Sequence, residues 1–276
     1  MLRRVWFRLT RPFRPAPPPP PAAEEAEAEG DGTPARHFVS DYRNYVSHLK
    51  SATDEKTAMA LAIGGQFEGF GQIQLDLLRM FGLKDGISFV DLACGSGRTA
   101  SAIAKHHEVE YLGVDVVPDL IAYAAKITPE HFRFVISENF DIDAPDNSVD
   151  LISAFSLFTH LQHEETYLYL EEVARVLKPG GRIVFSFLEF SMLSHWNVFT
   201  VTKDQAKANT RTHLNVFIER PVLELWAEHL GLTIHQIVPG NEEAIMLSAP
   251  AKLDDGTVLK ESAAFGQTVC VLEKPA

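Results

Sequence analysis

The chain of 276 residues contains only two cysteines, Cys94 and Cys270, and no apolar run of eighteen or more residues. Two cysteines cannot build a disulfide framework, and without a long apolar run we expect no helix that crosses a membrane. The N-terminal residues also lack the apolar stretch and cleavage site of a secretory signal peptide. Together these absences predict a protein of a reducing compartment, the cytoplasm.

Positive charge is scarce outside the first 15 residues. The net charge is −12 at pH 7, yet residues 1–15 carry five arginines and no acidic residue, so the rest of the chain is strongly acidic. An acidic body repels the phosphates that dominate nucleic-acid binding. We therefore expect a small-molecule or glycan substrate and no nucleic-acid partner.

Residues 1–34 divide by composition into a basic and aromatic piece, a proline run and an acidic piece. None of these can bury a core, so we expect a disordered tail. Within residues 2–11, apolar side chains recur at helical intervals opposite arginines, which is typical of an interfacial helix drawn to anionic lipid. A plain basic tail is the alternative. The first interpretation predicts weak membrane-surface contact through residues 2–11 and a peripheral location.

Helical patterns and then an alternation of strands and helices follow the tail. Residues 35–82 contain three helical stretches, the last with Ile73, Leu77, Leu78 and Phe81 on one stripe. The alternation specifies a parallel sheet covered by helices on both faces. A long connection without an obvious helix separates the last two strands, which predicts that they pair antiparallel. The predicted strands are 87–92, 110–114, 132–136, 149–155, 182–188, 232–238 and 267–272, and the predicted helices are 98–106, 118–127, 164–177 and 221–230.

The stretch VDLACGSGRTA contains the turn between the first predicted strand and its helix. Gly95, Gly97 and Ala100 match the spacing of a dinucleotide-binding turn. Asp91, however, ends the strand beside the turn, where its charge would repel a pyrophosphate and favour an ammonium or sulfonium group. Asp115 ends the second predicted strand, placed to accept both hydrogen bonds of a ribose diol. A ligand with these features is S-adenosylmethionine, which has a cationic methionine end and a ribose.

Four segments resemble, in this order, the class I S-adenosylmethionine-dependent methyltransferases: VDLACGSGR, YLGVDVVPDLIAYA, APDNSVDLISAFSLFTHL and EEVARVLKPGGRIVFSF. The resemblance covers roughly Phe81 to Leu272. It implies an enzyme that uses S-adenosylmethionine, with a Rossmann-like, doubly wound α/β sheet of seven strands in the order 3-2-1-4-5-7-6 and strand 7 antiparallel. We accordingly expect a methyltransferase domain over 83–276, with the helices of 35–82 capping the cofactor site and an insertion at 190–220 capping the substrate.

The resemblance also implies which residues contact the cofactor. The glycine turn would line the methionine moiety and Asp91 its amino group. Asp115 would hold the ribose, and Val116 would touch the adenine. Where the family often has an aspartate for the adenine amine, this chain has Glu138 followed by Asn139, and either side chain can accept from the amine. The implied cofactor residues are Asp91, Gly95, Ser96, Gly97, Asp115, Val116, Glu138, Asn139 and Phe155.

Methyl transfer to a hydroxyl requires alignment and a base, and the base should lie at the carboxyl ends of the strands. His160, after the fourth predicted strand, is our first candidate, followed by Glu189 and His195 after the fifth. A histidine that only starts a helix or fills the core is the alternative interpretation of His160. His160 and His163 have the spacing of metal ligands on a helix, but no acidic or cysteine pattern accompanies them, so we predict no metal.

The fourth predicted strand ends in SAFSLF, which lacks two motifs of other acceptor classes. The Asn-Pro-Pro-aromatic motif of enzymes that methylate adenine or glutamine is absent, and so is the Pro-Cys of cytosine-5 enzymes. The aromatic residues of 190–220 would roof an acceptor pocket. We therefore expect oxygen methylation of a small molecule, a sugar or a lipid-linked glycan.

Two other classes of function stay open, because one fold serves many activities. The first is a protein that binds S-adenosylmethionine without catalysis, such as a membrane-recruited partner of another enzyme. The second is a NAD-dependent oxidoreductase, which would use the same glycine spacing. The position of Asp91 argues against the second.

Overall fold

The computed structural model describes residues 37–210 and 214–276. The expectations for residues 1–34, including the interfacial helix at 2–11, therefore concern residues outside the described ones. No helix within the two described ranges is long and apolar enough to cross a membrane. The helices are α1 (His37–Ala52), α2 (Glu55–Ala62), α3 (Phe67–Met80), α4 (Arg98–Ala104), α5 (Pro118–Ile127), α6 (His163–Val176), α7 (Leu193–Ala208) and α8 (Arg220–His229). The strands are β1 (Ser88–Leu92), β2 (Glu110–Asp115), β3 (Arg133–Ile136), β4 (Val149–Ala154), β5 (Leu177–Phe187), β6 (Thr233–Val238), β7 (Ile245–Met246), β8 (Ala251–Lys252), β9 (Val258–Leu259), β10 (Ser262–Ala263) and β11 (Thr268–Glu273).

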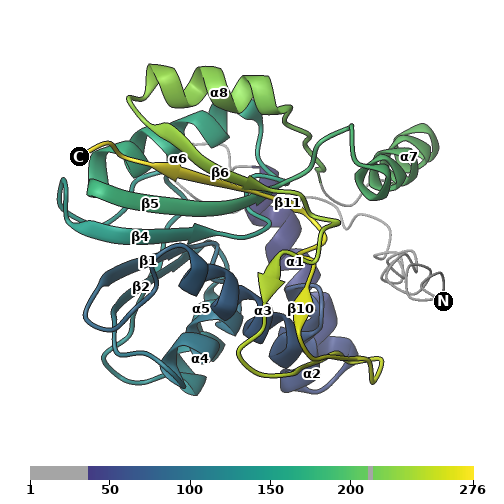
Figure 1. Cartoon of the computed structure of the whole chain (residues 1–276). Coiled ribbons are helices and arrows are strands. Elements are labelled where there is room, and N and C mark those ends of the chain that lie inside the picture. Colours follow the sequence, from purple (N-terminus) through teal and green to yellow (C-terminus); the bar gives the residue numbers. More distant parts are fainter. Residues whose placement is uncertain (1–36, 211–213) are drawn as a thin grey trace, which may run out of the picture.

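The seven longer strands form one sheet with helices on both faces (Figure 1). Their order is β3-β2-β1-β4-β5-β11-β6. The first five pair in parallel, whereas β11 pairs antiparallel with both β5 and β6. Helices α3, α4 and α5 lie on one side of the sheet, and α6 and α8 lie on the other (Figure 1). The predicted doubly wound fold, its strand order and its antiparallel last strand are confirmed.

Apolar side chains on both faces of the sheet form the core. The predicted stripe of Ile73, Leu77, Leu78 and Phe81 is buried against one face, which confirms how α3 packs. On the other face, Leu170 of α6 is fully buried among strand residues. Parallel strands covered on both faces are nearly continuous apolar runs. That continuity explains why the sequence pattern located most of the strands to within one or two residues.

Three features differ from the sequence prediction. Helix α7 lies within 190–220, where we expected a cap without assigning a helix, and His195 is its one buried residue, so no apolar stripe marks it. Strand β5 begins before the predicted 182, because Leu177 already pairs with Val149. The connection between β6 and β11 forms two small sheets, β7 with β10 and β8 with β9, whose two-residue strands are too short to show a period of two.

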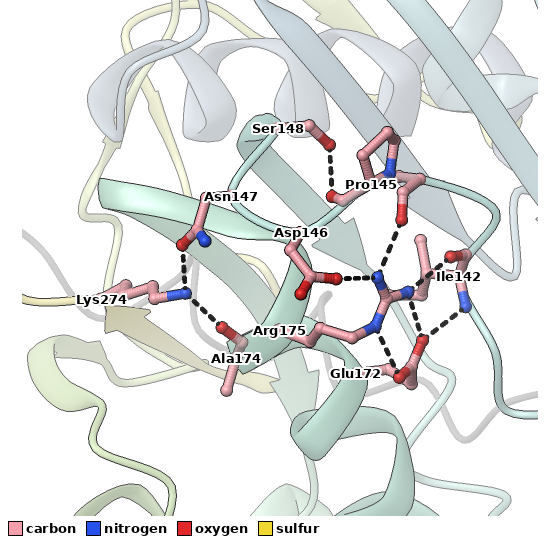
Figure 2. Close-up of polar contacts among 10 residues, drawn as sticks. Ile142, Pro145, Asp146, Asn147, Ser148, Glu172, Ala174, Arg175 and Lys274 are labelled. Carbon is pink, nitrogen blue, oxygen red and sulfur yellow. Dashed lines mark hydrogen bonds and ion pairs between the residues drawn. The ribbon is translucent and has the colours of Figure 1, made fainter.

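The connection between β3 and β4 contains no helix and is held by Arg175 of α6 (Figure 2). Arg175 donates to the carbonyl oxygens of Ile142 and Ala144, both at 3.0 Å, and to the carboxylates of Asp146 and Glu172. The hydrogen bonds from Arg175 lower the pKa of Glu172. Because all three guanidinium nitrogens donate, this one side chain fixes the path of the loop that carries the predicted adenine contacts.

Candidate active site

The glycine turn joins β1 to α4 at the carboxyl edge of the sheet. Gly95 and Gly97 have φ angles of +56° and +84°, a region that L side chains rarely adopt. A Cβ on Gly95 would lie 2.6 Å from Cγ2 of Ile63, and a Cβ on Gly97 would lie 2.9 Å from Cβ of Ala124. Both glycines are therefore required by backbone conformation and by the close approach of α2 and α5.

Asp115 ends β2 and is nine-tenths buried. Its two carboxylate oxygens accept from the backbone N–H groups of Gly95, at 2.9 Å, and Val117, at 3.0 Å. Burial raises the pKa of Asp115, and the backbone hydrogen bonds oppose that rise. Each carboxylate oxygen can accept a further hydrogen bond. Asp115 therefore holds the glycine turn in place and keeps the capacity to bind a diol.

Asp91 is the next-to-last residue of β1 and is 2% exposed. It accepts from the hydroxyl groups of Tyr111, at 2.8 Å, and Ser153, at 2.6 Å. Burial raises the pKa of Asp91 to about 6, against the effect of these two hydrogen bonds. The negative charge of Asp115 raises it further, while the positive charge of Arg98 lowers it. Asp91 is thus a carboxylate whose ionised form is costly in this site.

The hydrogen bonds found for Asp91 and Asp115 come from neutral donors, and neither carboxylate forms an ion pair among the described residues. Two buried anions near each other favour a cationic ligand and disfavour a pyrophosphate. A ribose diol matches the remaining acceptor capacity of Asp115. The two carboxylates therefore fit S-adenosylmethionine, which has a positively charged ammonium and sulfonium and a ribose diol.

Helix α2 lies over the glycine turn. The hydroxyl group of Ser96 is buried and donates to the carbonyl oxygen of Met59 at 2.9 Å. Arg98, in the first turn of α4, donates to the carbonyl oxygens of Ile63, at 3.2 Å, and Gly65, at 3.1 Å. Burial lowers the pKa of Arg98 to about 10, and the charge of Asp91 opposes that shift. Ser96 and Arg98 thus connect the turn to the helices before it in the chain.

The predicted adenine contacts lie at the ends of β2 and β3. Arg43 of α1 donates to the carbonyl oxygen of Val116 at 3.1 Å and to Oε1 of Glu138 at 2.6 Å. Asn139 is exposed, and the ring of Phe155 is buried, with its centroid 5.1 Å from that of Phe265. The sequence interpretation missed Arg43, because nothing in the local pattern of α1 indicates contact with residues 73 and 95 positions away.

His160 follows β4 and has a defined tautomer. Its Nδ1 lies 2.8 Å from the carbonyl oxygen of Leu214, an acceptor, so Nδ1 carries the proton and the neutral ring has its lone pair on Nε2. The ring also meets Tyr42 of α1 edge to face at 5.7 Å. Nε2 of His163 lies 3.0 Å from the carbonyl oxygen of Phe217. The two histidines thus bind different backbone carbonyls, and His160 has the tautomer that a base requires.

Glu189 and His195 lie after β5 in a buried polar cluster. Glu189 accepts from Arg220 at 2.8 and 2.9 Å and from the hydroxyl of Thr268 at 2.6 Å. Burial favours a higher pKa for Glu189, but these hydrogen bonds outweigh it and lower the pKa. Nδ1 of His195 accepts from the backbone N–H of Glu189 at 3.0 Å, and Nε2 donates to the carbonyl of Gly266 at 3.2 Å. Burial lowers the pKa of His195. The geometry therefore favours His160 over both as a base.

Four aromatic side chains, here called the aromatic cluster, gather beside this polar cluster: Phe190, Trp196, Phe199 and Phe217. The rings of Phe190 and Phe217 stack with centroids 4.5 Å apart and an interplanar angle of 10°. Trp196 meets Phe199 at 5.1 Å. Phe190 and Trp196 are 40% and 46% exposed. The predicted cap thus presents ring surface to solvent at the same edge of the sheet as the glycine turn.

A cavity of about 500 Å³ lies elsewhere, beneath the loop that Arg175 holds. Its walls include Val114, Val135 and Ile142. None of the cofactor or base residues predicted from the sequence lines it. The cavity nevertheless borders the carboxyl ends of β2 and β3, because Val114 precedes Asp115 and the lining residue Ser137 precedes Glu138.

Comparison with known proteins identifies the central part of the chain. A family described as "Methyltransferase domain" matches residues 89–181. A 2-methyl-6-phytyl-1,4-hydroquinone methyltransferase of Synechocystis is 23% identical over 182 residues, covering 64% of this chain and 51% of the relative. A sterol 24-C-methyltransferase of Aspergillus fumigatus is 31% identical over 121 residues, covering 42% of this chain and 31% of the relative. The chain thus spans about half or less of the length of these curated relatives.

Solved structures show the same fold at lower sequence identity. A methyltransferase in complex with the Trm112 activator of Haloferax volcanii has a TM-score of 0.57 and 18% identity. The match covers 86% of this chain and 97% of that one. An S-adenosylmethionine-dependent methyltransferase of Thermotoga maritima has a TM-score of 0.55 and 15% identity, covering 86% of this chain and 100% of that one. At 18% and 15% identity, the similarity between this chain and the two solved structures shows a shared fold only.

Proposed function

Because the chain belongs to the class I S-adenosylmethionine-dependent methyltransferases, we propose that it transfers the methyl group of S-adenosylmethionine to an oxygen of a small-molecule acceptor. The carrying observation is the pair of buried carboxylates, Asp91 and Asp115, neither of which forms an ion pair among the described residues. The tautomer of His160 supports an oxygen acceptor, because a hydroxyl must lose its proton during transfer. Two relatives, from Pyrenophora dematioidea and Aspergillus sclerotiorum, are named O-methyltransferases.

In the proposed reaction the sulfonium supplies an electrophilic methyl group, and the chain supplies position and a proton acceptor. Asp115 binds the ribose and Asp91 places negative charge beside the methionine end. Nε2 of His160 accepts the hydroxyl proton as the carbon–oxygen bond forms. The carbonyl oxygen of Leu214 keeps Nδ1 protonated and holds the ring in position.

The acceptor enters, in this proposal, beneath the aromatic cluster of 190–220. Exposed rings at Phe190 and Trp196 suit an acceptor with an apolar or ring-shaped body, because aromatic faces bind such surfaces favourably. The helices of 35–82 cap the cofactor on the opposite side, consistent with the contact between Ile63 and the glycine turn. A sugar or a lipid-linked glycan is the more polar acceptor to test beside an apolar alcohol or phenol.

The base assignment is tested with His160→Asn. Asparagine retains a donor for the Leu214 carbonyl but cannot accept a proton at neutral pH, so we expect turnover to fall about 10²- to 10⁴-fold with unchanged cofactor affinity. His163→Asn is the matched control, because that ring also donates to a backbone carbonyl of the same segment. Near-normal turnover in a folded His160→Asn protein would exclude the assignment and turn attention to Glu189 and His195.

The reaction class is tested separately. We expect the full chain to bind radiolabelled S-adenosylmethionine and not NADH, because two buried anions repel a pyrophosphate. Cell extracts incubated with the protein and S-adenosylmethionine should then yield a product heavier by one methylene, detected by mass spectrometry. Binding without any such product would favour a non-catalytic cofactor-binding protein, and binding of NADH would favour an oxidoreductase.

A further inference from the structure

Arg43 is the one side chain of α1 for which the structure gives hydrogen bonds to both loops beside the predicted adenine position. It reaches the carbonyl oxygen of Val116, directly after β2, and the carboxylate of Glu138, directly after β3. The two loops come from neighbouring strands, since β2 pairs with β3. One guanidinium therefore connects a helix near the start of the described chain to both loops.

The position of α1 makes this connection relevant to the cofactor. Val46 and Leu49 of α1 are buried together with Val117 and Leu120, at the start of α5. Helix α1 thus lies beside the carboxyl ends of the strands, the edge where the ligands of doubly wound sheets bind (Figure 1). To widen the adenine side of the site, α1 must separate from Val116 and Glu138.

Glu138 directly follows the loop residue after β3 and is where the sequence predicts the adenine contact. Its Oε1 lies 2.6 Å from Nη2 of Arg43. The carboxylate that would meet the adenine amine is therefore already bound by a side chain of α1.

The ion pair between Arg43 and Glu138 is weak enough to break and re-form, as a contact that opens and closes the site requires. Both side chains are partly exposed, 40% for Arg43 and 45% for Glu138, and ion pairs of this kind are weak. Nε of Arg43 is buried and has no hydrogen-bond partner among the described residues. The guanidinium thus has an unsatisfied donor next to the adenine position, which a ring nitrogen of the ligand would satisfy.

We propose that Arg43 and Glu138 form a clasp that holds α1 against the adenine side of the site and limits the exchange of S-adenosylmethionine and S-adenosylhomocysteine. The inference rests on the proposed function for its ligands, whereas the clasp itself is a property of the protein alone. Arg43 and Glu138 act as positioning residues, since they control α1 and take no part in the chemical step.

The test uses Arg43→Gln, Glu138→Gln and the double variant, each in the full chain. Lys50→Gln is the matched control, because Lys50 pairs with Asp119 at 2.6 Å with similar exposure, but joins α1 to α5 only. Hydrogen exchange of α1 is measured without ligand, and the dissociation rate of S-adenosylhomocysteine is measured by stopped flow. We expect both single variants to raise α1 exchange and to raise the dissociation rate about two- to fivefold, the effect of one exposed charge pair. The double variant should add nothing, and Lys50→Gln should leave the dissociation rate unchanged.

Two results would overturn the clasp. Unchanged α1 exchange in both single variants would exclude it, whatever the ligand data. Weaker binding in Glu138→Gln alone, with normal α1 exchange, would make Glu138 a direct adenine ligand. Failure of the proposed function is distinguishable. A wild-type protein that binds neither S-adenosylmethionine nor S-adenosylhomocysteine would refute the effect on ligand exchange, whereas hydrogen exchange of α1 would still test the clasp.

Discussion

At the scale of single residues, the site combines two aspartates of different character. Asp115 accepts two backbone N–H groups and so helps to build the turn beside it. Asp91 accepts two hydroxyl groups and is more deeply buried, which raises its pKa to about 6. A buried carboxylate without an ion-pair partner costs folding free energy, and a cationic ligand reduces that cost when it binds.

Asp91→Asn should stabilise the free protein at neutral pH. The folded pKa of Asp91 is above the unfolded one, so its contribution to stability is fully present below about pH 4 and is lost as the pH rises through about 6. That loss amounts to about 2–3 kcal/mol in the wild type. Urea unfolding at pH 5 and pH 7.5 should show a smaller pH dependence in the variant, together with weaker S-adenosylmethionine binding. An identical pH dependence in both proteins would refute the raised pKa.

Asp115→Ala should weaken S-adenosylmethionine binding strongly, because two charge-assisted hydrogen bonds to the ribose, each worth about 1.5–3 kcal/mol, are lost. Calorimetric titration measures the affinity, and circular dichroism checks folding, since the carboxylate also accepts from Gly95 and Val117. A folded variant with wild-type affinity would remove the ribose assignment.

At the scale of elements, the glycine turn is shaped by the helices around it. Ile63, at the end of α2, occupies the space next to Gly95, and Ala124 of α5 occupies the space next to Gly97. At Gly95 and Gly97 the turn therefore has no room for a side chain even before a ligand is considered. The spacing of its glycines reflects packing as much as ligand binding.

Gly97→Ala should destabilise the protein by about 2–4 kcal/mol, because the new Cβ meets Ala124 at 2.9 Å and the φ of +84° is unfavourable for alanine. Adding Ala124→Gly should restore only a small part of the loss, because it removes the Cβ of Ala124 but leaves its Cα 3.0 Å from the new Cβ, together with the backbone strain. Thermal unfolding of the two variants separates these contributions. A double variant no more stable than Gly97→Ala would mean that the Cβ of Ala124 is not the source of the loss.

At the scale of the whole molecule, the doubly wound topology gathers the ends of β1, β2, β3 and β4 at one edge, with α1 and α2 beside them. The charge is distributed unevenly along the chain, because the first 15 residues carry five arginines and the rest of the chain is acidic. Catalysis and any membrane contact of the tail would therefore use separate parts of the chain.

Deleting residues 1–34 should leave the melting temperature and the cofactor affinity unchanged, because this composition cannot contribute to a core. If residues 2–11 bind anionic lipid, sedimentation with anionic liposomes should be lost in the truncated protein and should weaken at high salt in the full chain. A truncated protein that fails to fold would place the domain boundary elsewhere.

Much of the fold was readable from local pattern. Strands buried on both faces are apolar runs, helices such as α3 carry a stripe of period 3.6, and the glycine turn has a characteristic spacing. Helix α7 was missed because it buries only His195, so no stripe distinguishes it from a loop. The roles of Glu189 and His195 were equally unreadable, since their partners include Arg220, Thr268 and Gly266, which are far away in the chain.

The sequence by itself therefore determined the strand–helix alternation, the turn and the two aspartates, because each depends on neighbours within a few residues. Only the tertiary structure decided that Arg43 meets Val116 and Glu138, across 73 and 95 residues, and that His160 is fixed by the carbonyl of Leu214. Contacts of this kind depend on which elements the sheet order brings together, and no local pattern of side chains encodes them.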